Sequence, residues 1–178
     1  MIIIKNTIYD ISELDSPFFN FSRRVSTNTN YTARFDIRIF QYEPTIISKG
    51  NHSPFELTHL QEICYDQSAY IQGIVETATF NECTEFINLC LSCGGGAGSP
   101  GEWTELDLRR ATSKECAGRI AWFWNEVNKY MTLPPSRTYS HTPSEGSYFD
   151  DGIFWQFCFI LLNNTETKGI VLSGYCSD

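Results

Sequence analysis

The sequence predicts an α+β domain with a largely antiparallel sheet, formed by N-terminal strands and a C-terminal β-hairpin and packed against about three central helices. Three observations lead to this prediction. The chain has 178 residues, a length typical of one domain, so residues 1–178 should fold as a single domain. Runs rich in β-branched and aromatic residues lie near both ends, and helix-capping patterns lie between them.

Two strands are expected near the N-terminus, at residues 2–11 and 33–42. The second run alternates apolar with charged residues, which is typical of a strand with one face in water. Residues 12–32 between them contain Pro17 and a cluster of Ser, Thr and Asn, so they are expected to form a loop. The alternating apolar positions of the second run are Phe35, Ile37 and Ile39.

Three capping boxes predict three helices, because each places a hydroxyl before the first turn and a glutamate three residues later. The boxes occupy residues 53–56, 79–82 and 112–115. The first helix should begin at Pro54 and reach at least Tyr65, and the second should end at Gly94. The third must end before Pro134 and Pro135. The expected buried stripe of the second helix is Cys83, Phe86, Ile87 and Cys90.

Residues 69–79 fit either a helix or a short strand, with Gly73 counting mildly against a helix. The C-terminal residues 152–176 form two β-type runs joined by a polar segment, which predicts a hairpin. The first of these runs is apolar at consecutive positions, so we expect a central strand with both faces covered, or with one face covered by a partner.

The charge balance points to the class of partner. The chain carries 13 Lys and Arg against 21 Asp and Glu, a net charge of −8. Nucleic acids and anionic lipids select basic surfaces, so neither is expected to bind directly, and a basic partner fits better. The N-terminal apolar run is too short for a secretory signal. The seven cysteines are an odd number spread along the chain, which fits reduced thiols better than a disulfide framework. We therefore expect a cytoplasmic protein.

No cofactor or metal is expected. The glycine cluster at residues 94–98 follows a helix instead of a strand and lacks the lysine of a phosphate loop, so a flexible helix cap is the better interpretation. Cys90 and Cys93 form a CxxC pair without further ligands at zinc-site spacing. The pair lies at a helix C-terminus, where the helix dipole disfavours a thiolate, so structural cysteines are favoured.

Two loop-like stretches combine acidic and aromatic residues, as recognition surfaces for basic proteins do. The alternative is a solvated acidic surface with the aromatic rings packed inward. In the recognition hypothesis the aromatic rings fill pockets of the partner and the carboxylates pair with its lysines or arginines. The partner-binding residues expected on this basis are Glu102, Trp103, Glu105, Tyr148, Phe149, Asp150 and Asp151.

An acidic α+β domain without catalytic motifs, with these acidic–aromatic loops and the aromatic run at residues 154–159, resembles the immunity proteins of bacterial contact-dependent inhibition and polymorphic toxin systems. The resemblance spans the chain and involves no shared motif, so it assigns no binding residue. It implies a cognate antitoxin-like inhibitor that binds a basic toxin domain, typically a nuclease, and covers its active site or substrate surface. Its oligomeric state is left open.

The sequence is also compatible with two other functions. One is a small thiol-dependent or hydrolytic enzyme that uses His59 or His141 with a cysteine, although no catalytic motif supports it. The other is a structural subunit that uses the C-terminal hairpin as a pairing edge for another strand.

Overall fold

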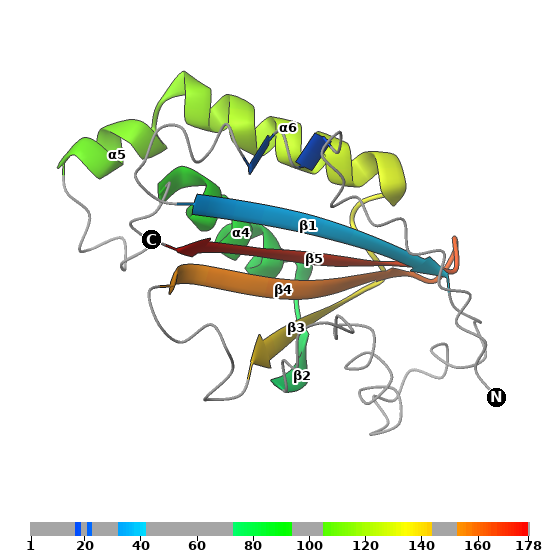
Figure 1. Ribbon diagram of the computed structural model, residues 1–178. Helices are drawn as coiled ribbons and strands as arrows, with labels where there is room; N and C mark the ends of the chain where they lie inside the picture. The colour runs from blue at the N-terminus through cyan, green and yellow to red at the C-terminus, as the bar shows by residue number, and fades with distance from the viewer. Residues whose placement is uncertain are drawn as a thin grey trace.

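The computed structural model describes residues 17–18, 21–22, 32–41, 73–93, 105–143 and 153–177. Five strands and three helices of seven or more residues follow one another in the described part of the chain (Figure 1). In chain order they are β1 (Thr32–Gln41), β2 (Gly73–Ala78), α4 (Phe80–Cys93), α5 (Glu105–Ala111), α6 (Lys114–Tyr130), β3 (Arg137–Pro143), β4 (Ile153–Asn163) and β5 (Lys168–Ser177).

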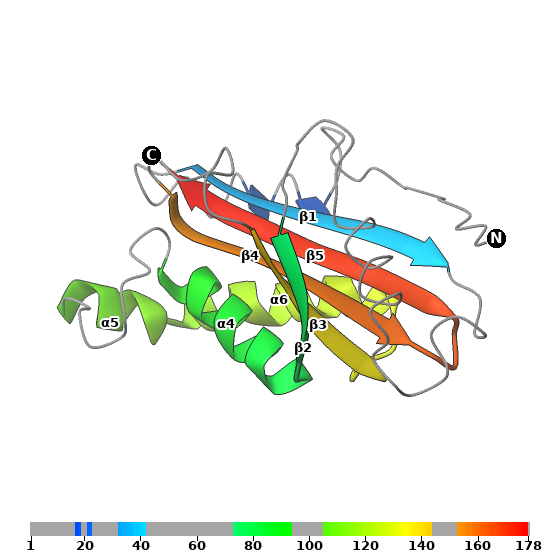
Figure 2. The ribbon, with the colours of Figure 1, turned by 90° about the horizontal axis from the view of Figure 1, so that it is seen from below.

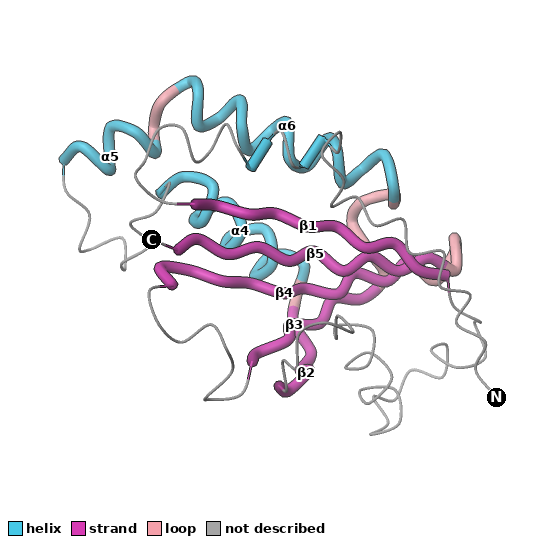
Figure 3. Tube along the Cα trace, viewed as in Figure 1, coloured by secondary structure: helices cyan, strands magenta, loops and turns pink. Residues whose placement is uncertain are grey.

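The strands form one sheet in the order β1-β5-β4-β3-β2, and every neighbouring pair is antiparallel. The three helices lie on the same side of this sheet (Figure 2). The fold is therefore α+β with an antiparallel sheet, as predicted. The tube in Figure 3 shows how β1 and β2, which are neighbours in sequence order, end up at opposite edges of the sheet.

The C-terminal hairpin is confirmed, and it lies in the middle of the sheet. β4 and β5 pair from Ile153↔Ser177 to Asn163↔Lys168. β5 also pairs with β1 along its whole length, and β4 pairs with β3 from Phe159 to Leu162. The edges of the described sheet are therefore β1 and β2, so the prediction of a pairing edge on the hairpin is wrong. The hairpin strands are internal because each has a neighbour on its other side.

β4 buries side chains on both faces of the sheet, as its apolar sequence predicted. Trp155, Phe157 and Leu161 belong to the main core, on the face that α4 and α6 cover. Ile160 and Leu162 belong to a second cluster on the opposite face. The other members of this second cluster are Phe40, Val75, Tyr139 and Val171.

Two glycines of β5 make room for aromatic rings from the neighbouring strands. Gly174 lies opposite Phe35 on β1 and Phe157 on β4, and a Cβ there would lie 2.8 Å from the Phe157 ring. Gly169 lies opposite Phe40, whose ring occupies the space that a Cβ would take. A larger residue at either position would displace a buried ring.

The second predicted helix is confirmed as α4, and its capping box is formed. The Thr79 backbone N–H donates to Glu82 Oε2 at 2.6 Å, and the Glu82 N–H donates to Thr79 Oγ1 at 3.1 Å. These bonds satisfy amides that the first turn leaves without a helical partner. Cys83, Ile87 and Cys90 are buried as expected, but Phe86 is 40% exposed. Phe86 lies at the margin of the buried stripe, and its ring packs against Phe159 of the main core.

The third predicted helix is confirmed as α6, but its cap is Ser113, one residue later than expected. Ser113 Oγ accepts from the Cys116 N–H at 3.1 Å. Thr112 cannot cap α6 because it completes α5, where its N–H and Oγ1 both donate to the Leu108 carbonyl. α6 ends at Tyr130, before Pro134.

Several other expectations need correction. Residues 73–78 of the ambiguous segment form a strand, and β3 was not predicted. Within the expected N-terminal loop, Pro17, Phe18, Phe21 and Ser22 are helical. Phe18 and Phe21 are buried against Trp122 and Phe123 of α6, which explains why this part of the loop is ordered on the core. The strand expected at residues 2–11 and the helix expected from Pro54 lie outside the described residues.

Candidate protein-binding surface

Of the seven predicted partner-binding residues, the structure describes Glu105. It is the first residue of α5, so it lies in a helix and not in the expected loop. Its carboxylate is exposed and forms an i,i+4 ion pair with Arg109, whose side chain is also exposed. A pair this exposed contributes little to stability, and both groups remain accessible. Glu102, Trp103, Tyr148, Phe149, Asp150 and Asp151 lie outside the described residues, so their binding role stays a prediction.

The sequence contains a stronger acidic signal than these two stretches. Residues 50–108 hold nine Asp and Glu and no Lys or Arg, while the rest of the chain holds 12 Asp and Glu against 13 Lys and Arg. One continuous segment therefore carries the whole net negative charge. The net charge of the complete chain hides this asymmetry, whereas the charges of successive segments of the sequence reveal it.

The described part of this acidic segment places three glutamates on one strand–turn–helix unit. Glu76 on β2 and Glu82 and Glu85 on α4 are all exposed. Glu85 Oε1 accepts from Asn81 Nδ2 at 3.3 Å. Hydrogen bonds from the Thr79 backbone and hydroxyl lower the pKa of Glu82, so this carboxylate stays ionised at neutral pH. Among the described residues none of the three glutamates has a basic partner.

Exposed apolar side chains accompany these carboxylates. Ile74 on β2 is 65% exposed and Phe86 on α4 is 40% exposed. Phe159, Ser140 and Glu76 are successive cross-strand partners, so their side chains share one face of the sheet. Phe86 packs edge-on against Phe159 on that face, with ring centroids 6.3 Å apart.

We call these five residues of β2 and α4 the acidic patch: Ile74, Glu76, Glu82, Glu85 and Phe86. Large exposed apolar side chains beside unpaired carboxylates are typical of a surface that binds a basic protein. The apolar groups supply contact area that becomes dry on binding, and the carboxylates orient the partner and exclude acidic competitors.

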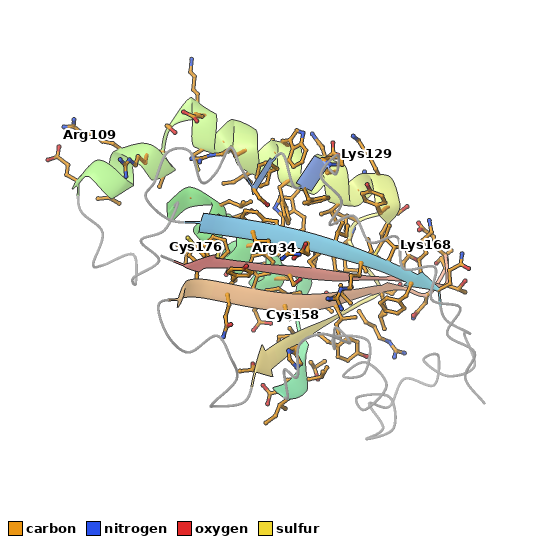
Figure 4. All side chains as sticks on the ribbon, viewed as in Figure 1. Arg34, Arg109, Lys129, Cys158, Lys168 and Cys176 are labelled. Carbon is orange, nitrogen blue, oxygen red and sulfur yellow. The ribbon has the colours of Figure 1, made fainter. Side chains whose placement is uncertain are left out.

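Three basic side chains lie on elements other than those of the acidic patch. Arg109 extends from α5, Lys129 from α6 and Lys168 from the start of β5, all away from β2 (Figure 4). These three cations form ion pairs with Glu105, Glu126 and Glu166, and not with the carboxylates of the acidic patch.

Of the five cysteines whose side chains the structure describes, Cys158 on β4 is partly exposed and the other four, Cys83, Cys90, Cys116 and Cys176, are buried. Burial raises the pKa of the Cys83 thiol far above its ordinary value, whereas nucleophilic cysteines have a lowered pKa. The Cys116 thiol donates to Ser92 Oγ at 3.4 Å.

Other chemistry has equally little support in the described ranges. Cys90 lies in the last turn of α4, and no three His, Cys, Asp or Glu side chains among the described residues are placed to hold a metal ion. His141 is buried in β3, while His59 lies outside the described residues. Of the helices described, none combines the length and the apolar character needed to cross a bilayer.

No protein-family model matches the chain, and no curated protein matches it. Two crystal structures of citrus MAF1, in different space groups, can be aligned with the structure of this chain. They share 12% and 14% sequence identity with it, with TM-scores of 0.48 and 0.47. Each alignment covers 88% of this chain and 98% of the MAF1 chain. Similarity at this level implies no shared function.

Proposed function

We propose that this chain is a cytoplasmic immunity protein, which binds a cognate toxin domain and neutralises it. The toxin is a basic protein of the nuclease class, and the inhibitor covers its active site or its nucleic acid-binding surface. The observation that supports this proposal best is the acidic patch, where three exposed glutamates and two exposed apolar side chains occur in a segment without any lysine or arginine.

The physical basis of such inhibition is charge mimicry. A nuclease holds the phosphate backbone with lysines and arginines, so its active surface has a positive potential. An acidic surface is attracted to this potential and accelerates association, which matters for an inhibitor that must act before the toxin does. Ile74 and Phe86 would then provide the apolar contact that slows dissociation.

Coexpression tests the proposal directly. The probe is the basic protein encoded beside this chain in the source genome, expressed under a tight promoter. The proposal expects that this protein stops growth when expressed alone, that coexpression of the chain restores growth, and that the two copurify in equal amounts. If the neighbouring protein is toxic and the chain neither binds it nor restores growth, the proposal is wrong.

A further inference from the structure

β2 is an edge strand of the described sheet. It pairs with β3 on one side, in an unbroken register from Gly73↔Pro143 to Ala78↔Thr138, and no described strand lies on its other side. In an antiparallel pair, alternate residues direct their N–H and C=O groups toward the neighbour, and the intervening residues direct theirs away. The outer side of β2 therefore presents a row of backbone donors and acceptors.

Within its own six residues, β2 lacks the features that usually protect an edge strand. Proteins blunt such edges with lysine, proline, β-bulges or covering groups, because an open edge pairs with other chains. β2 contains no lysine, proline or bulge along its six residues, and its Ile74 side chain is exposed.

The opposite edge of the described sheet, β1, does have protecting groups. On β1 the Phe35 N–H donates to Ser22 Oγ at 3.0 Å, so a hydroxyl from the preceding segment occupies an edge amide. β1 also carries an ion pair between Arg34 Nε and Asp36 Oδ2 at 2.9 Å. The two edges of the described sheet thus differ, and β2, which no described strand covers on its outer side, is the edge that carries part of the acidic patch.

We infer that the edge of β2 binds an extended segment of the basic partner as an additional antiparallel strand, with lysine or arginine side chains of that segment facing Glu76 and an apolar side chain facing Ile74. This inference rests on the proposed function and specifies how the partner docks. Backbone hydrogen bonds would supply affinity, and alternate side chains would supply specificity.

Charge complementarity favours such a partner over a second copy of this chain. Pairing β2 with β2 of another copy about a two-fold axis would bring two acidic patches together. Like charges at such an interface are unfavourable. A strand with basic side chains removes this repulsion and replaces it with attraction.

A peptide probe tests the inference without knowledge of the partner. We would use the nine-residue peptide Lys-Thr-Val-Thr-Lys-Thr-Val-Thr-Lys, which alternates lysine with valine along one face of a strand, with both ends blocked, and its analogue N-methylated at every second residue. The peptide should bind in low salt, and backbone amides of β2 should become protected from hydrogen exchange at every second position. The analogue should bind at least about tenfold more weakly, because it loses two or three backbone hydrogen bonds.

A matched pair of variants locates the contact. Ile74→Lys places a protecting charge on the edge and should weaken peptide binding at least about tenfold. Leu108→Lys makes the same charge change at an exposed aliphatic side chain on α5. It should change peptide binding by less than about twofold. Both side chains are exposed, so both variants should fold normally.

Three results would overturn the inference: no binding at about 1 mM peptide, equal binding of the N-methylated analogue, or binding without protection of β2. The coexpression test separates this failure from failure of the proposed function. If the chain neutralises its neighbour while β2 stays unprotected in their complex, the docking mode is wrong and the function stands. If the peptide pairs with β2 but the toxic neighbour is not neutralised, the function is wrong.

Discussion

Adding one methyl group at Gly169 should destabilise the sheet, because the ring of Phe40 occupies the space above this glycine. Gly169 on β5 and Phe40 on β1 are cross-strand partners. A Cβ at residue 169 would overlap the Cζ, Cε1 and Cε2 atoms of that ring, whereas carbon atoms in contact normally stay about 3.5–4.0 Å apart. In Gly169→Ala the ring must therefore move.

The size of the effect follows from the burial of Phe40, which is 4% exposed in the second apolar cluster. Overpacking a core costs about 1–3 kcal/mol, and a phenylalanine side chain gains about 1.5–3 kcal/mol from full burial. We therefore expect Gly169→Ala to lower the free energy of unfolding by about 2–3 kcal/mol. For a domain of this size that corresponds to a drop in Tm of about 4–12 °C.

Gly118 provides a matched control within the same chain. It lies inside α6 and is exposed, and a Cβ there would meet nothing within 4 Å. Gly118→Ala should raise the free energy of unfolding by about 0.5–1 kcal/mol, because alanine favours the helix and restricts the unfolded chain. The same chemical change thus has opposite signs at the two positions.

Urea unfolding of both variants and of Phe40→Ala, alone and with Gly169→Ala, measures these values. The cost of Gly169→Ala should largely vanish in the Phe40→Ala background, because the ring with which the methyl group collides is absent. If Gly169→Ala lies within about 0.5 kcal/mol of the wild type, or if its cost persists without the Phe40 ring, the packing account of this pair is wrong.

Three further predictions concern the helices. Ser113→Ala should lower the free energy of unfolding by about 1 kcal/mol, because the Cys116 amide loses its cap; urea unfolding measures this, and Ser113→Asp should retain the stability. The pKa of Glu82 is lowered from its ordinary value of 4.5 by its bonds to Thr79. The stabilisation from these bonds is complete above about pH 4.5 and is lost as the pH falls through the lowered pKa. In Glu82→Gln the free energy of unfolding should therefore fall less steeply as the pH decreases in this range, and an unchanged slope would contradict this. Because the Cys83 thiol is buried and its pKa is raised, iodoacetamide should label it only at the rate of unfolding, as read by mass spectrometry, and fast labelling of the native protein would contradict this.

Local chemistry explains which elements the sequence could predict. The box at Thr79 and Glu82 and the alternation around Phe35 and Ile37 act within a few residues, so α4 and β1 follow from them directly. The C-terminal hairpin follows in the same way, since its two apolar runs flank the polar turn that begins after Asn163.

The missed elements depend on distant contacts. β3 contains Ser, His and two Thr and has a weak apolar pattern, yet Tyr139 is fully buried because β2 and β4 flank the strand. α5 has only seven residues, too few for a periodic pattern. For the site, the charge of the segment could be read from the sequence, but the exposure of Ile74 and Phe86 could not. That exposure depends on which strand lies at the edge and on how α4 is turned over the sheet.

The role of the acidic patch in binding can be measured by comparing the affinities of two variants of equal charge for the neighbouring toxic protein. Glu76→Gln/Glu85→Gln removes two negative charges from the acidic patch. Ala121→Lys/Asn125→Lys makes the same net change on the exposed face of α6. By isothermal titration at low salt, the first variant should bind at least about tenfold more weakly and the second should bind almost like the wild type. If the two variants lose affinity equally, or if the first keeps full affinity, the acidic patch is not the binding surface.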